Sequence, residues 1–271
     1  MNIFPAIPER FPDLAAHCAA FERYALIFYT GEADHDFYLS LKAEHSRNVY
    51  AHACAIAGME PMFAEDMELH RALLLAALYH DFGRFMQFHQ YRTFSDAQSV
   101  NHGLLSVREV RREGLLAEES PRVRRLVLAG VALHNRFALS LRLPADVRAV
   151  VGAVRDADKL DIMRIMAGQL TGEGEPDPVV ALHAKRSSEI SPAVLDAVMN
   201  RQLVAYGDLA TTTDFKLLVC GWLYDLNYNF SRKSAVREGA LCRILDSLPS
   251  TDTLQDFFTH YKKDLAAYGA L

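Results

Sequence analysis

The stretch Leu74-Leu75-Ala76-Ala77-Leu78-Tyr79-His80-Asp81-Phe82-Gly83-Arg84 decides the fold, because in it an apolar helical run ends in histidine, carboxylate, glycine and arginine. Helical spacing joins His80 to Leu73, Ala76 and Ala77, so its imidazole is expected on the buried face. Neighbouring side chains on a regular helix point about 100° apart, so His80 and Asp81 can share one ion only if the backbone turns there. Gly83 is expected to permit that turn. The stretch therefore predicts the floor of a metal site.

Other apolar helical stripes each carry one more residue that could bind a metal. His45 lies on the stripe of a helix expected from about residue 34 to residue 58, and His134 lies on a helix that Ser120-Pro121 opens. Asp158 lies on a third stripe, among valines and isoleucines. An ionised carboxylate in such a place costs several kcal/mol unless it is paired or bound to a cation. Asp158 is therefore expected to have a partner.

The order His45, His80-Asp81, Asp158 resembles the ligand pattern of the HD superfamily of metal-dependent phosphohydrolases. With His102 and His134 between them, the pattern is similar to the dinuclear branch of that superfamily. The resemblance spans about Leu39 to Met166. The stretches 80–84, 91–102 and 156–161 look like a group of bacterial HD proteins that has no settled substrate, so the resemblance does not name the natural substrate.

The resemblance implies a centre with one or two divalent transition-metal ions. His45, His80, Asp81 and Asp158 would hold one ion, His102 and His134 would hold the second, and Asp81 would bridge them. Nitrogen and oxygen donors suit iron or manganese, which we favour, and are also compatible with cobalt, nickel, zinc or magnesium. The absence of thiolates from the set disfavours a purely structural zinc.

The resemblance also implies hydrolysis of a small phosphate ester, a nucleotide or a related metabolite, by metal-activated hydroxide. The expected catalytic residues are Asp81, Arg84 and Lys159, and the cations expected to hold phosphate oxygens are Arg84, Arg92, Arg136 and Lys159. Surface ion pairs are the alternative for these cations, and Lys159 has Asp156 and Asp161 as nearby partners. Arginine is a poor proton donor, so Arg84 is not expected to act as an acid.

Two other functions remain open at this point. Some HD-fold enzymes with a similar set of ligands are dinuclear iron oxygenases, which cleave carbon bonds with dioxygen. A non-catalytic nucleotide-binding regulator is the second alternative, although no ligand of the metal pattern is missing.

The helical patterns predict an all-α fold, and the resemblance implies that it is an HD-domain helical bundle with additional C-terminal helices. We expect a helical lead-in at residues 1–30, an HD domain carrying the metal site at 31–168, and a C-terminal helical extension at 169–271 packed on the same domain. Residues 85–100 are expected to form an aromatic and polar loop, and residues 168–178 a linker. The aromatic segment 214–228 is expected in a core or a subunit contact, so a homodimer is one arrangement it allows.

Composition excludes several partners. The net charge of −5 and the pI near 6.1 do not favour duplex nucleic acid, and no apolar run approaches the roughly 20 residues that span a bilayer. Four cysteines without paired spacing and the lack of a signal-like N-terminus are typical of a reduced, cytoplasmic protein.

Structural or surface roles are expected for the histidines outside the ligand pattern, with His89 kept as a pocket candidate. These histidines are His17, His35, His52, His70, His89, His183 and His260.

Overall fold

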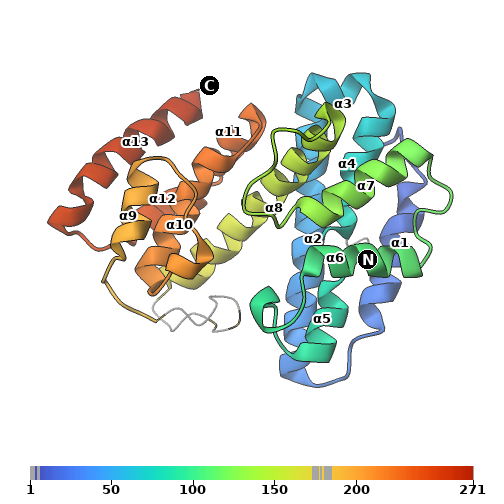
Figure 1. Cartoon of the computed structure of the whole chain (residues 1–271), viewed down its shortest axis with the longest axis horizontal. Coiled ribbons are helices and arrows are strands. Elements are labelled where there is room, and N and C mark those ends of the chain that lie inside the picture. The colour runs from blue at the N-terminus through green and yellow to red at the C-terminus, as the bar shows by residue number, and fades with distance from the viewer. Residues whose placement is uncertain (1–3, 5–6, 173–176, 178, 180–184, 271) are drawn as a thin grey trace. The chain divides into compact units, whose positions relative to one another are not determined.

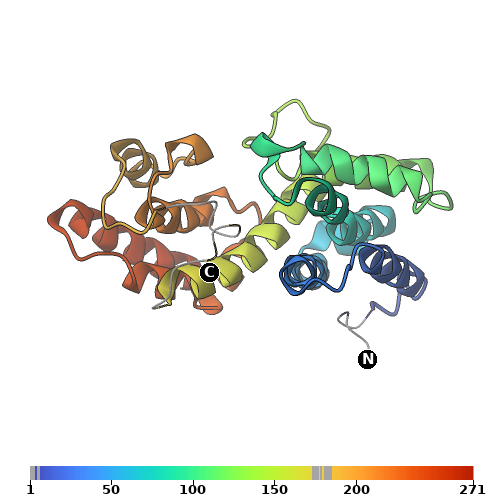
Figure 2. The same cartoon turned by 90° about the horizontal axis from the view of Figure 1, so that it is seen from below.

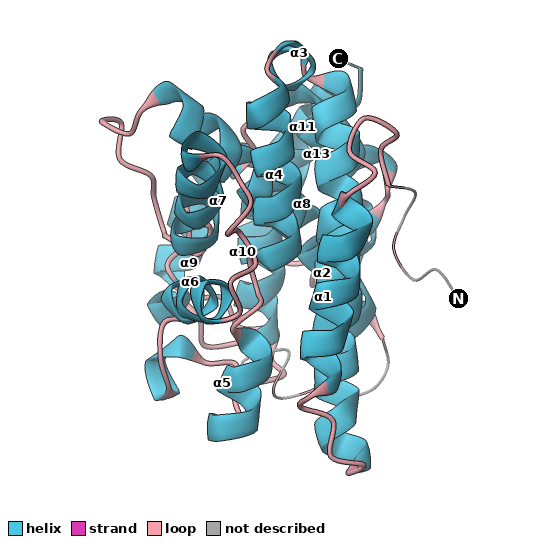
Figure 3. Cartoon of the chain, turned by 90° about the vertical axis from the view of Figure 1, so that its right-hand side faces the viewer, coloured by secondary structure: helices cyan, strands magenta, loops and turns pink. Residues whose placement is uncertain are grey.

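The computed structural model describes residues 4, 7–172, 177, 179 and 185–270. Figure 3 shows helices joined by loops, and the described residues contain no strand, only an isolated bridge between Lys185 and Thr211. The prediction of an all-α fold is therefore confirmed.

Figure 1 labels most of the helices along the chain. The first part of the chain contains α1 (Leu14–Leu26), α2 (Ala33–Met59), α3 (Pro61–Glu65), α4 (Met67–Tyr79), α5 (Arg84–Tyr91), η1 (Asp96–Gln98), α6 (His102–Arg112), α7 (Pro121–Leu133) and α8 (Ala145–Thr171). The remainder contains α9 (Pro192–Met199), η2 (Tyr206–Asp208), α10 (Thr212–Asp225), α11 (Asn229–Arg237), α12 (Ala240–Asp246), η3 (Asp252–Leu254) and α13 (Gln255–Ala270).

Two compact units divide the chain, Met1–Asp161 and Ile162–Leu271, and the division falls inside α8. The predicted domain boundaries at residues 30 and 168, and the packing of the C-terminal extension on the HD domain, stay predictions. The linker expected at residues 168–178 begins too early, because α8 continues to Thr171. Most of the rest of that segment, residues 173–176 and 178, lies outside the described residues.

Helix α4 is the centre of the first unit. Its residues from Ala72 to Tyr79 are completely buried, as the apolar run predicts. It packs between α2 and α7, and α7 comes so close that a Cβ at Gly130 would lie 2.8 Å from the Cβ of Ala76. Because His80 and His134 directly follow α4 and α7, this close packing brings their rings to a centroid distance of 5.1 Å.

Helix α7 begins where the sequence predicts. The Ser120 side chain accepts a hydrogen bond from the backbone N–H of Val123, and Pro121 occupies the first turn. The serine satisfies a donor that the helix itself cannot, and proline lacks the donor that would be left over at that position. The cap fixes the start of the helix that carries His134 at its other end.

The expectation of a loop throughout residues 85–100 is wrong, because residues 84–91 form α5. Phe85 and Phe88 lie three residues apart and are buried, Phe85 against Phe21 and Phe28 of the N-terminal region. The burial of aromatic side chains at helical spacing therefore favours a helix despite the polar residues of the same segment, such as Arg84, Gln87 and His89. The helix ends at Arg92, which adopts a left-handed conformation with φ 56°.

Gly83 is needed for a different reason from the one expected. Its φ of −73° is available to any residue, so the turn does not require glycine. A Cβ at this position would instead lie 2.5 Å from the backbone nitrogen of Ser106 in α6. The N–H of Gly83 donates to Ser106 Oγ at 2.8 Å. Glycine thus lets α6, which begins with His102, approach the segment that carries Asp81.

The second unit, yellow to red in Figure 2, has α10 as its most buried helix. The prediction that the 214–228 segment forms core holds for most of it, since Phe215, Leu217 to Leu223 and Leu226 are buried. Thr211 and Asp214 form a capping box at its start. Among the described residues, no helix has the length and apolar character needed to cross a membrane.

Candidate metal centre

Four buried imidazoles converge from four places in the first unit. His45 comes from the middle of α2, His80 and His134 from the residues just after α4 and α7, and His102 from the first residue of α6. The Nε2 atoms of His45 and His80 are 3.3 Å apart, and those of His102 and His134 are 3.0 Å apart. The imidazoles thus form two pairs with their Nε2 atoms turned toward each other.

Asp81 lies between the two pairs. Its Oδ2 is 3.7 Å from the Nε2 atoms of both His45 and His80. Its Oδ1 is 3.5 Å from His102 Nε2 and 3.7 Å from His134 Nε2. One carboxylate therefore presents a different oxygen to each pair, which is the arrangement expected of a residue that bridges two ions.

Asp158 completes the side of the centre formed by His45 and His80. Its Oδ1 is 3.1 Å from His45 Nε2 and 3.8 Å from His80 Nε2. Two sets of donor atoms are each compact enough to hold an ion, the first from His45, His80 and Asp158 and the second from His80, Asp81 and His134. These sets contain five of the six predicted ligands, and the sixth, His102, has its Nε2 3.0 Å from that of His134 and 3.5 Å from Asp81 Oδ1. The structure therefore brings all six residues together.

The second nitrogen of each imidazole, Nδ1, faces an oxygen acceptor at 2.6 to 2.8 Å. These acceptors are a carboxylate for His45 and His102 and a backbone carbonyl for His80 and His134, namely Asp161, Asp96, Ala77 and Val131 respectively. Because these oxygens accept, each Nδ1 carries a proton. The four Nε2 atoms then point into a common space, where each can bind a shared cation once it carries no proton, and the bonds from Nδ1 orient each ring as a ligand.

The two orienting carboxylates were not predicted as such. Asn48 donates to Asp161 at 3.0 Å, and Gln87 and Asn135 donate to Asp96 at 3.1 and 3.2 Å. Asp161 lies three residues after Asp158 on α8, so helical spacing places it near the same face. Asp96 has no comparable signal, because it lies in the short 3₁₀ helix η1, whose position beside His102 no helical spacing predicts.

Burial and charge set the protonation of the ligands. Burial lowers the pKa of His80 to about 4 and, together with the Arg84 guanidinium, lowers the pKa of His102 to about 3. Burial opposes the charge on His45 as well, but hydrogen bonds to Asp158 and Asp161 outweigh it and raise its pKa to about 9. At neutral pH, His80 and His102 are therefore neutral donors, whereas His45 must release a proton to bind a metal.

Two cations contact the carboxylate of Asp81. Lys42 Nζ donates to Oδ2 at 2.9 Å, and Arg84 Nε donates to Oδ1 at 3.3 Å. Burial alone would raise the pKa of Asp81, but these cations and the nearby imidazoles hold it well below its usual value. Arg84 was predicted near the centre. Lys42 was not, although it lies three residues before His45 and so shares its side of α2.

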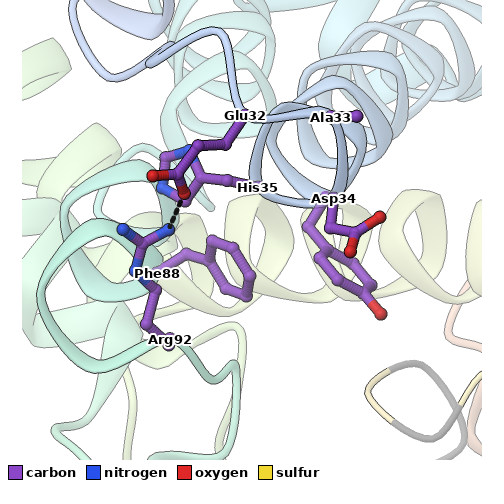
Figure 4. Close-up of a pocket in the computed structure, with 7 residues that line it drawn as sticks. Glu32, Ala33, Asp34, His35, Phe88 and Arg92 are labelled. Carbon is purple, nitrogen blue, oxygen red and sulfur yellow. Dashed lines mark ion pairs between the residues drawn. The ribbon is translucent and has the colours of Figure 1, made fainter.

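Arg92, one of the other cations predicted to hold phosphate oxygens, lies at a cavity separate from the six candidate metal ligands. Arg92 lines a cavity of about 340 Å³ between the start of α2 and the end of α5, together with Glu32, His35 and Phe88 (Figure 4). Arg92 pairs with Glu32 at 3.6 Å, and none of the six ligand residues lines this cavity. His89, kept as a pocket candidate, is not among the lining residues either.

Arg136 and Lys159 each follow a ligand in the chain. Arg136 is exposed two residues after His134, and its backbone carbonyl accepts a hydrogen bond from the buried Arg155. Arg155 also donates to the carbonyl of His134 at 3.1 Å and so holds the end of α7. Lys159 is buried beside Asp158 on α8. The substrate-binding roles of Arg136 and Lys159 stay predictions.

The remaining histidines take no part in the two compact donor sets found among the described residues. His17 contacts Glu119 at 3.3 Å, and His70 packs its ring against Phe11. His183 lies outside the described residues. The structure therefore adds no histidine to the candidate centre beyond those that the sequence pattern selected.

Comparison with known proteins identifies the segment that contains this centre. The family model of the HD domain matches residues 43–163, which include all six ligand residues. No significant match was found among curated proteins or among solved structures. HD domains bind divalent metals and generally belong to metal-dependent hydrolases, and the nitrogen and oxygen donors assembled here fit such ions. Residues 43–163 therefore contain an HD domain.

Proposed function

We propose that the protein is a metal-dependent phosphohydrolase that acts on a small phosphate ester, a nucleotide or a related metabolite. The observation that carries this proposal is the position of Asp81, with one oxygen facing the His45–His80 pair and the other facing the His102–His134 pair. Bound divalent ions would lower the pKa of a water molecule and offset the charge of a phosphoryl group.

The chain's own residues support phosphate binding beside this carboxylate. The NH1 of Arg84 donates to Gln87 Oε1 at 2.7 Å, to the carbonyl of Phe94 at 2.6 Å and to Asp96 at 3.3 Å. These bonds hold the planar guanidinium in one orientation next to Asp81, which favours phosphate recognition. Since the net charge is −5, attraction of an anionic substrate would depend on such local cations.

The test begins with elemental analysis of protein purified without oxygen, followed by a screen of phosphate esters with the metal found. We expect one or two ions per chain and phosphate release that stops when a chelator removes the metal and returns when it is restored. Robust turnover by metal-stripped protein would contradict the proposal. Iron and manganese are the ions we favour, with cobalt, nickel, zinc and magnesium as the others to assay.

A dinuclear iron oxygenase is the second candidate, favoured by the four imidazoles and two carboxylates without a thiolate, a donor set that suits iron. It predicts iron in the purified protein, substrate-dependent oxygen uptake and a mixed-valence electron paramagnetic resonance signal. Absence of all three would exclude it.

A nucleotide-binding regulator without turnover remains a third proposal. It would be supported by tight binding of a nucleotide combined with silence in the same screen of phosphate esters. Catalytic release of phosphate from any of the esters would exclude a regulator without turnover.

A further inference from the structure

Lys42 contacts the buried carboxylate of Asp81 while its own side chain keeps partial contact with solvent. Its side chain is 18% exposed and that of Arg84 is 13% exposed, whereas Asp81, which both contact, is 4% exposed. A ligand that enters the centre from this side would therefore meet the two cations before it reaches the carboxylate. They approach from different helices, Lys42 from α2 and Arg84 from α5.

The two cations are held very differently. Arg84 is fixed by the acceptors around its NH1, which belong to Gln87, Phe94 and Asp96. Among the described residues, Lys42 donates one hydrogen bond, to Asp81 Oδ2. Its ammonium also lies 5.2 Å from the centre of the Phe94 ring. A flexible stem that ends in a single hydrogen bond can change partner at little cost.

The atom that Lys42 contacts is also the atom that a metal needs. Asp81 Oδ2 faces the Nε2 atoms of His45 and His80, so an ion held by these imidazoles would lie beside the same oxygen. An ammonium and a divalent cation at one oxygen repel each other strongly in a buried site. Metal binding would also neutralise Asp81, so the carboxylate would no longer need the lysine.

We propose that Lys42 is a displaceable counter-ion, which holds Asp81 when metal is absent and binds the anionic group of the substrate when metal is present. This inference rests on the proposed phosphohydrolase function and adds to it a substrate-binding residue. Arg84 stays in place in both states, because the acceptors that hold its NH1, on Gln87, Phe94 and Asp96, are not among the six candidate metal ligands. Lys42 and Arg84 then form a pair of cations for a phosphate group, one mobile and one fixed.

Amine labelling tests the exchange without relying on activity. The protein is treated with an amine-reactive reagent in metal-free form, after metal loading, and after metal loading with inorganic phosphate, and labelling of Lys42 is measured by mass spectrometry. We expect several-fold more labelling after metal loading and a return toward the metal-free level with phosphate. The exposed Lys262 should label equally in all three samples. Unchanged Lys42 labelling in protein shown to contain metal would overturn the proposal.

The variants Lys42→Met and Lys42→Arg test the same idea through binding. For Lys42→Met we expect tighter metal binding in chelator competition, because the competing cation is gone. We also expect KM for phenyl phosphate to rise roughly 10- to 100-fold with a smaller change in kcat, since a charge-assisted hydrogen bond is lost. Lys42→Arg should recover part of the KM, and Lys262→Met should match the wild type in both measurements.

Weaker metal binding in Lys42→Met, or an unchanged KM, would assign Lys42 a structural role and overturn the proposal. Circular dichroism of each variant shows whether it is folded. If the wild type releases no phosphate from any ester, the proposed function fails, whereas labelling and metal affinity still decide whether Lys42 leaves Asp81 on metal binding and whether it responds to phosphate.

Discussion

Asp81 in the first unit and Asp214 in the second are both buried carboxylates, with whole-residue exposures of 3% and 0%, yet their surroundings differ in kind. Asp214 accepts from the backbone N–H groups of Ser191, Ala210 and Thr211 at 2.8, 3.0 and 3.2 Å and from the Ser191 hydroxyl at 2.7 Å. Asp81 has side chains around it, namely two cations and four imidazoles.

The two carboxylates differ in their partners, which are mainly backbone N–H groups for Asp214 and side chains for Asp81, and the kind of partner indicates the role. Backbone donors cannot leave, so they stabilise the charge of Asp214 permanently and make it part of a helix cap. The partners of Asp81 are side chains, namely four imidazoles whose Nε2 atoms converge on one space, the anchored guanidinium of Arg84 and the ammonium of Lys42. Burial of a carboxylate therefore indicates a stabilising residue or a metal ligand, and the donors around it decide between the two.

The strongest way to break this comparison is the variant Asp81→Asn. The neutral amide of asparagine cannot supply the negative charge that two bound metal ions would share. Because metal ions contribute several kcal/mol to the stabilisation of such transition states, we expect the rate of phosphate release to fall on the order of 1,000-fold. Steady-state assays with phenyl phosphate and elemental analysis provide the measurement. Asp252→Asn, at an exposed position, is the matched control. Turnover within tenfold of the wild type would contradict the role of Asp81 as a carboxylate shared by the two metal ions.

Asp214→Ala should affect stability and leave metal content unchanged. The change leaves several donors without an acceptor and removes half of a capping box, so we expect a loss of about 2–4 kcal/mol in the free energy of unfolding. Denaturant titration gives the loss, and elemental analysis of the folded protein gives the metal content. A variant that unfolds like the wild type but has lost its metal would reverse the roles that we assign to the two aspartates.

Asp161→Asn sharpens the comparison within the metal centre itself. Asp161 accepts from His45 Nδ1 at 2.6 Å, and outer partners of this kind typically change metal affinity about 10- to 100-fold. We expect a loss of metal affinity in that range with little loss of folding, measured by competition with a chelator of known affinity. Asp208→Asn, at an exposed position, should bind metal like the wild type. An affinity equal to the wild type would mean that Asp161 does not orient the histidine.

Glu119 is a third buried carboxylate, neutralised by side chains but remote from the ligand set. Burial raises its pKa, but hydrogen bonds from His17 and Arg71 outweigh this effect and hold the pKa at about 2, below the usual 4.5. Its contribution to stability is therefore complete above pH 4.5 and is lost as the pH falls toward 2.

We expect Glu119→Gln to unfold about 1–2 kcal/mol more easily than the wild type at pH 7, after allowance for partial solvent screening. The difference should shrink as the pH is lowered from 4.5 toward 2, which urea titrations at a series of pH values measure. Glu65→Gln, at an exposed position, should show no such trend. A difference that does not depend on pH over this range would assign the effect to packing.

Much of the fold follows from local pattern. The apolar run before His80 predicts the buried helix α4, and Ser120-Pro121 predicts the start of α7, because both signals act within one helix. The prediction for residues 85–100 failed because the reason that 84–91 form a helix lies outside the segment, in the aromatic side chains of the N-terminal region. Gly83 is a similar case, since the neighbour that requires glycine belongs to α6.

By itself, the sequence determined an all-α fold and the resemblance of its first part to the HD superfamily, and it picked out six candidate ligands, because helical spacing and ligand order are properties of the chain. Only the tertiary structure decided what stands opposite each ligand: Asp161 behind His45, Asp96 behind His102, and Lys42 on Asp81. The physical reason is that hydrogen bonds and charge pairs depend on distance in space. Elements far apart in sequence come within reach only when α2, α4, α6, α7 and α8 pack around the same buried carboxylate.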